Sequence, residues 1–270
     1  MAHHIGDISI LSIGGADQLA YFDNVTLNLT NTMGNTASVL AGGQRSTILK
    51  TEGTIDVNLR GVSTTTSDAA THLDLTSLAF DGYTFTCFSS VALNIAYTSQ
   101  NLPCVGERYR LFDNTNLILT ATIVAQVVSG MAEAFMVPFS DASALADSYG
   151  NLGLVYNGVT YTIAMGIQEV SLGAERDGVQ EITLKLEGRA PDSGAFPAAP
   201  TGTTGLLQKA LNAYNTALTV AFQSITGTNG VNVGGDFKFA SASFELADEQ
   251  IVPVAYQFKS HGPLTIAQGT

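Results

Sequence analysis

Basic residues are scarce in this chain of 270 residues. Only 11 Lys and Arg stand against 23 Asp and Glu, which gives a formal net charge of -12. No basic residue occurs from Gly61 to Glu107 or from Leu111 to Glu175. Nucleic acids and anionic membranes are bound by clustered cations. The composition therefore argues against a protein that docks on either, and we expect an acidic surface that repels DNA.

Charged residues of both signs are also few. They make up 13% of the chain, against roughly 25% in ordinary soluble domains, while hydrophobic residues reach 45%. Charged side chains are depleted where one protein packs on another. We therefore expect extensive contacts between subunits, and the alternative is a weakly charged monomer.

Cysteines and long apolar runs are equally rare. Cys87 and Cys104 are the two cysteines, and they lack the paired spacing of a metal site or a disulfide framework. No run approaches the roughly 18 apolar residues of a membrane span, and no secretory signal opens the sequence. We expect a cytosolic product that has no membrane partner.

The strong catalytic and cofactor motifs are missing. No GxSxG elbow, P-loop, HExxH or calcium-loop pattern occurs. His72 and Asp74 share one face if the chain is extended there, but two ligands do not make a metal site. His3 and His4 stand in the N-terminal segment, where a solvated end is the ordinary case. We predict no catalytic, cofactor or metal residues, and we expect a protein that is not an enzyme.

Other polar and glycine pairs are better explained by local structure. The acidic pairs Asp248–Glu249 and Glu175 with Asp177 lie in predicted turns, where solvated carboxylates are common. Turn glycines explain two further pairs better than phosphate binding does, because no strand, helix and Lys accompany them. These pairs are Gly14–Gly15 and Gly234–Gly235.

Alternating apolar residues predict a mainly β fold. Thr54 to Arg60 is the clearest strand, with Ile55, Val57 and Leu59 on one face. The same period marks further strands around residues 25–29, 91–97, 117–128, 161–167 and 182–186. The last two form a hairpin around Asp177–Gly178. From Asn31 to Gly53 the alternation lapses, which indicates a long, mobile loop.

The second half of the chain contains a linker, a helix and a closing hairpin. Residues 188–203 are rich in Pro and Gly and predict a linker. Residues 204–226 carry an apolar stripe at helical spacing that ends at Gly227. Residues 237–263 form a hairpin in which Val254, Tyr256 and Phe258 share the apolar face. We interpret its aromatic residues as core rather than as a surface that stacks bases.

These features together resemble a family of known proteins. An early strand pair, AYFDNVTLNL and EGTIDVNLRG, surrounds a Gly-rich loop. A helix, LLQKALNAYNTALTVAFQ, precedes the closing FASASFELADEQIVPVAYQFKSHGP. This layout looks like a bacteriophage tail tube (major tail) protein. The resemblance covers about the first 60 and the last 70 residues, and nothing in it accounts for the middle of the chain.

The resemblance implies a single domain, residues 1–270, with a tail-tube-like β-sandwich or barrel flanked by one α-helix. For the middle of the chain, about residues 62–187, we expect additional strands that form either an insertion on the barrel or a second β lobe. The resemblance also implies a virion protein of the tail, made in the host bacterial cytoplasm, that forms homohexameric rings. Such rings stack into a tube through which DNA passes as non-specific cargo. Besides copies of itself, the partners that the resemblance implies are other tail proteins, such as terminator, sheath or tape measure proteins. The alternatives are a head decoration or head-tail completion protein, or a carbohydrate-binding or hydrolytic β domain.

Overall fold

The protein is mainly β, as the sequence predicts. The computed structural model describes residues 8–17, 22–38, 43–60, 75–102, 109–136, 149–156, 159–173, 180–188, 206–212, 215–224, 230–247 and 253–268. Two short helices accompany the strands in these ranges: α1 (Met131–Phe135) and α2 (Leu206–Asn212). The strands are β1 (Ile8–Ile13), β2 (Ala16–Asp17), β3 (Phe22–Ser38), β4 (Gly43–Arg60), β5 (Leu75–Phe80), β6 (Tyr83–Thr84), β7 (Phe88–Leu102), β8 (Leu111–Gln126), β9 (Tyr149–Tyr156), β10 (Val159–Gly173), β11 (Glu181–Gly188), β12 (Leu218–Ser224), β13 (Val231–Ala247) and β14 (Pro253–Gln268).

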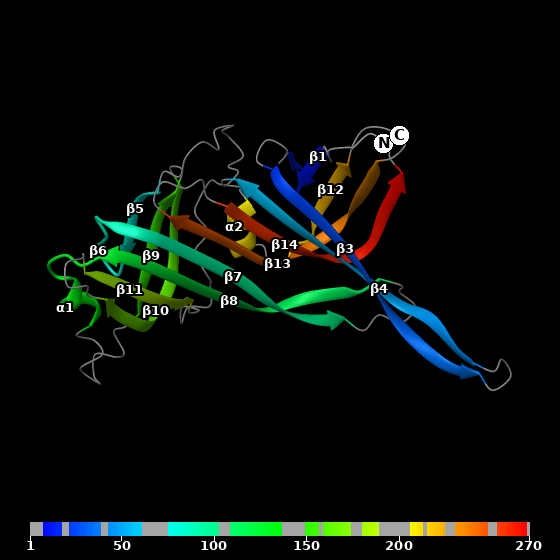
Figure 1. Ribbon diagram of the computed structural model, residues 1–270, viewed down its shortest axis with the longest axis horizontal. Helices are drawn as coiled ribbons and strands as arrows, with labels where there is room; N and C mark the ends of the chain where they lie inside the picture. The colour runs from blue at the N-terminus through cyan, green and yellow to red at the C-terminus, as the bar shows by residue number, and fades with distance from the viewer. Residues whose placement is uncertain are drawn as a thin grey trace.

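The strands join into one antiparallel sheet that branches at β13. The main path runs β2-β1-β12-β13-β7-β8-β11-β10-β9-β5-β6, while β14, β4 and β3 form a branch from β13. In Figure 1 strands β5, β6, β9, β10 and β11 lie at one end of the molecule, and the far part of the β3–β4 hairpin extends to the other end. The strands of segment 62–187 therefore continue the same sheet, because β7 pairs directly with β13.

Strand β13 is shared by two neighbours along one of its edges. Its first half, Val231 to Phe237, pairs with β12, and its second half, from Ser241, pairs with β7. Strand β14 follows the other edge along almost the whole length, with register shifts at Gly235/Phe237 and Phe239/Ser241. Bulges bend a strand and change its twist. They allow β13 to leave one neighbour and join the next.

The closing hairpin is confirmed, and its predicted apolar face is buried. β13 and β14 pair in register, and Val254, Tyr256 and Phe258 are at most 2% exposed. The ring of Phe239 lies 4.8 Å from that of Phe258 and 6.0 Å from that of Tyr256. The aromatic residues of the hairpin are therefore core. Its acidic turn lies outside the described residues.

One hydrophobic core connects the two halves of the sheet. It draws on β4, β7, β8, β10, β11, β13 and β14, together with both helices. Tyr161, Ile163 and Met165 of β10 and Ile182, Leu184 and Leu186 of β11 face this core, and the two strands pair as the predicted hairpin. Strand β8 lies inside the sheet between β7 and β11.

The prediction of a long, mobile loop from Asn31 to Gly53 is wrong. Residues 31–38 and 43–53 continue strands β3 and β4, which stay paired from Phe22↔Leu59 to Ser38↔Gly43. The alternation is hidden because this part of the hairpin is not half-buried. Polar and apolar residues can therefore occupy either face, while the backbone hydrogen bonds still form.

The prediction of a helix over residues 204–226 is wrong beyond its first third. Helix α2 ends at Asn212, and Leu218–Ser224 form strand β12 between β1 and β13. Leu218 and Phe222 belong to the helical stripe, but together with Val220 they also fit a period of two, so the pattern is ambiguous. Pairing with β1 and β13 favours the strand, because it satisfies the backbone hydrogen-bonding groups on both edges of Leu218–Ser224.

The buried face of β14 gives a test of the fold. Tyr256→Asp or Phe258→Asp places an unpaired charge in the core, which costs several kcal/mol against a total stability of about 5–15 kcal/mol. We expect both variants to be unfolded in circular dichroism. Thr265→Asp, at an exposed position of the same strand, should melt close to the parent. A natively folded Phe258→Asp protein would contradict this placement of the hairpin.

Candidate functional site

At the beginning of β8, side chains bond to the backbone on one edge of the strand. Strand β11 pairs with β8 only from Thr120 to Gln126, so before Thr120 β8 has β7 along one edge alone. On the other edge, the Phe112 N–H donates to Nδ1 of His261 at 3.4 Å, and the Phe112 carbonyl accepts from Nζ of Lys238 at 3.1 Å. Side chains of β14 and β13 thus stand where a neighbouring strand would be.

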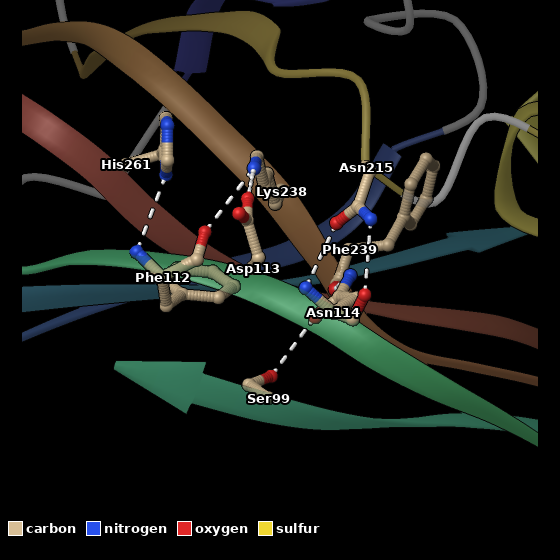
Figure 2. Close-up of polar contacts among 8 residues, drawn as sticks. All are labelled: Ser99, Phe112, Asp113, Asn114, Asn215, Lys238, Phe239 and His261. Atoms are coloured by element: carbon tan, nitrogen blue, oxygen red, sulfur yellow. Dashed lines mark hydrogen bonds and ion pairs between the residues drawn. The ribbon is translucent and has the colours of Figure 1, made fainter. Parts of the chain in front are cut away.

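Two residues further along, an asparagine side chain acts like a peptide group. The Asn114 N–H donates to Oδ1 of Asn215 at 2.8 Å, and Nδ2 of Asn215 donates to the Asn114 carbonyl at 3.0 Å. The Asn114 side chain donates to the Phe239 carbonyl at 3.0 Å and accepts from Ser99 Oγ at 2.9 Å. Figure 2 shows these contacts converging from β7, β8, β13 and the segment before β12.

We call the side chains of Asn114, Asn215, Lys238 and His261 the β8 edge cap. It fills the place where β12 gives way to β7 along β13, because Lys238 and Phe239 lie between the two ladders. An unpaired strand edge invites pairing with another chain. The cap therefore closes this edge against other strands.

Lys238 of the cap forms an ion pair with Asp113 in which only the Lys side chain is buried. Nζ of Lys238 lies 2.6 Å from Oδ1 of Asp113, with the Lys238 side chain 5% exposed and that of Asp113 46% exposed. The hydrogen bond from Lys238 lowers the pKa of Asp113. Burial, followed by the charge of Lys238, lowers the pKa of His261. At neutral pH the imidazole is therefore neutral and can accept the Phe112 N–H.

Buried polar side chains gather in this region. Within the described ranges, the polar or charged residues that are buried are Asn114, Lys238 and Ser260. Ser260 Oγ accepts the N–H of Gly53 at 2.8 Å, at the point where the β3–β4 hairpin leaves β14. The edge cap thus lies beside the base of that hairpin. A lone Lys between Phe237 and Phe239 was the one sequence signal for the cap.

The far half of the β3–β4 hairpin projects from the sheet. Strand β14 pairs with β4 only from Thr54 to Arg60, and in Figure 1 the rest of the hairpin extends away from the body. We call residues 31–51 the arm. Three large apolar side chains of the arm are exposed: Met33 by 54%, Ile48 by 56% and Leu49 by 55%.

One apolar face of the arm continues the buried face of the hairpin. Val25 and Leu27 pack against the core, and Leu29 and Met33 follow on the same face of β3 because side chains alternate along a strand. Ile48 stands opposite Met33 in register. Leu29, at the base of the arm, is already 48% exposed. The face that the core covers in the body is therefore uncovered on the arm.

The candidate residues of the sequence do not form a common site. Gly14–Gly15 occupy the turn between β1 and β2 with positive φ, as predicted. Gly234–Gly235 lie inside β13 and not in a turn. A Cβ on Gly235 would lie 2.7 Å from the Leu264 side chain, so this glycine makes room for packing. Cys87 is a free, exposed thiol.

The remaining candidates lie outside the described residues. They are His3, His4, His72, Asp74, Cys104, Glu175, Asp177, Asp248 and Glu249. In the part of the chain that is described, no three His, Cys, Asp or Glu side chains are grouped to hold a metal ion. No helix in those ranges has the length and apolar character needed to cross a membrane.

Comparison with known proteins gives no match: neither a family model nor a curated protein matches this chain.

The edge cap predicts that removing the side-chain amide of Asn114 lowers the stability of the protein. Asn114→Ala leaves the buried Phe239 carbonyl without its donor, and we expect a loss of about 1–3 kcal/mol in the free energy of unfolding. Asn116→Ala, on the exposed part of the same strand, should change it by less than about 0.5 kcal/mol. Urea unfolding measures both, and equal effects would contradict the role of the cap.

His261 predicts a pH dependence of stability. Its pKa in the folded protein lies below the ordinary 6.5, so the unfolded chain binds this proton first as pH falls. The stabilisation is complete above about pH 6.5 and is lost as pH falls through the lowered pKa. His261→Gln keeps an acceptor for Phe112 but does not titrate. Urea unfolding at pH 7 and pH 5 should therefore show a smaller pH difference for this variant than for the parent.

The pKa of Asp113 in the folded protein lies below 3.8, so this carboxylate is ionised at both pH values and does not enter this comparison. An unchanged pH difference in His261→Gln would contradict the assignment.

Proposed function

We propose that the chain is a structural subunit of a phage tail tube, which assembles with copies of itself into stacked homohexameric rings that conduct DNA. The observation that carries this proposal is the arm. It is an ordered hairpin that projects from the sheet with Met33, Ile48 and Leu49 exposed. Exposed apolar clusters mark surfaces that bind other proteins.

The charges of the arm favour a second copy as the partner. Residues 31–51 contain Arg45 and Lys50 and no acidic residue, whereas the rest of the chain has nine basic and 23 acidic residues. A basic, apolar arm is therefore complementary to the acidic body of another subunit. Complementary charges guide association and set its register.

Free strand edges support the same proposal. Strand β3 is 17 residues long and pairs only with β4 in the described sheet. Its other edge offers backbone donors and acceptors to a neighbouring subunit, and closing a ring removes such edges. The edge cap closes the first part of β8 to such pairing, whereas the outer edge of β3 is open in the described sheet. The acidic body would keep DNA from binding to the tube as it passes.

Self-association through the arm gives a direct test. The double variant Met33→Ser/Ile48→Ser removes apolar area from the arm, and we expect it to raise the dissociation constant of the assembly at least about tenfold. Sedimentation velocity over a range of concentrations measures this. Leu172→Ser, at a position of β10 that is 48% exposed, is the matched control and should assemble like the parent.

Monomers of the parent protein at every concentration would contradict the proposed function. Assembly of the double variant with unchanged affinity would contradict the role of the arm.

A further inference from the structure

The base of the arm is held by a segment from a distant part of the chain. The ladder between β4 and β14 ends at Thr54, and Gly53 bonds to Ser260 of β14. Beyond this point, Tyr109 forms a parallel bridge with Thr51, and the Arg110 N–H donates to the Thr51 carbonyl at 3.2 Å. The residues immediately before β8 thus touch the arm where the ladder between β4 and β14 has already ended.

The side chain of Arg110 contacts both strands of the hairpin. Its Nη2 donates to Thr32 Oγ1 of β3 at 2.8 Å, and its Nη1 lies 3.4 Å from Glu52 Oε2 of β4. A planar guanidinium presents its donors to two partners in a fixed geometry, whereas a Lys ammonium is a compact charge on a flexible stem. Arg110 therefore fixes β3 and β4 to one another and to the start of β8.

A bulge lies directly beyond this contact. Thr32 pairs with Lys50 and Met33 pairs with Ile48, so Leu49 is an extra residue in β4. Bulges bend a hairpin locally. A Cβ on Gly34 would lie 2.8 Å from a Leu49 methyl group, so Leu49 packs over a residue that has no side chain. The direction of the arm is set between the Arg110 contact and this bulge.

We propose that Arg110 is the positioning residue of the arm and fixes its direction relative to the sheet before any partner binds. Arg110 is two residues from Phe112, whose N–H and carbonyl are held by the edge cap. The contact is thus anchored to the point where the sheet branches. A projecting hairpin with a fixed direction loses less conformational entropy when it binds than a swinging one. That consequence for assembly rests on the proposed function.

Distances between spin labels in the monomer test this proposal directly. One label is placed at Ser46→Cys in the arm and one at Glu187→Cys, an exposed position of β11, with Cys87 and Cys104 changed to Ser. The double variant Met33→Ser/Ile48→Ser provides the background, so that copies do not associate. Pulsed electron resonance should give a narrow distance distribution with Arg110 present. Arg110→Ala should broaden it by at least about twofold.

Two further variants complete the design. Lys185→Ala breaks an exposed ion pair with Glu169 on the body and should leave the distribution unchanged. Arg110→Lys keeps the charge but lacks the rigid fork of guanidinium donors, so we expect an intermediate width. A distribution in Arg110→Ala as narrow as with Arg110 present would overturn the proposal. So would a parent-like width in Arg110→Lys, because it would show that the rigid guanidinium is not needed.

The outcome is independent of whether the protein assembles, since every distance is measured on monomers. Failure of this experiment would leave self-association intact, and a protein that never assembles could still have an arm positioned by Arg110.

Discussion

The structure depends on how one strand, β13, is shared between two neighbours. A strand that changes partners leaves backbone groups without a ladder at the crossing point, and buried groups of this kind are costly. Here the gap is filled by Lys238 and by the Asn114 and Asn215 amides. This junction connects the part of the sheet that contains β12 with the part that contains β7, and the core continues across the junction. The junction is what lets β7 and β12 both pair with β13.

The same region separates a closed strand edge from an open one. At Phe112 and Asn114, side chains occupy the hydrogen-bonding positions of β8, which prevents another strand from pairing there. A few residues earlier, Arg110 holds the base of the arm, whose apolar face has no cover within the described chain. The beginning of β8 thus closes one edge to other strands and also positions the arm. We interpret this as a division between contacts that stabilise the fold and the surface that we propose joins copies of the protein.

Much of the fold could be predicted from alternation, but the candidate site could not. Strands with one buried face, such as Thr54 to Arg60 or the closing hairpin, show the period of two that burial imposes. The arm lacks this burial, so its residues carry no clear pattern. Leu218 and Phe222 fit a strand and a helix equally well, and only pairing with β1 and β13 decides. The edge cap joins residues more than 100 positions apart, and apart from the lone Lys238 in an apolar strand the local sequence gives no sign of such contacts.

The central claim is that this subunit is built to assemble with copies of itself. Electron microscopy of the purified, concentrated protein in negative stain tests it most directly. The account predicts rings with a central channel, or filaments made of stacked rings, with the arm at a contact between subunits. A field of uniform single subunits at all concentrations, or particles without a channel, would contradict it.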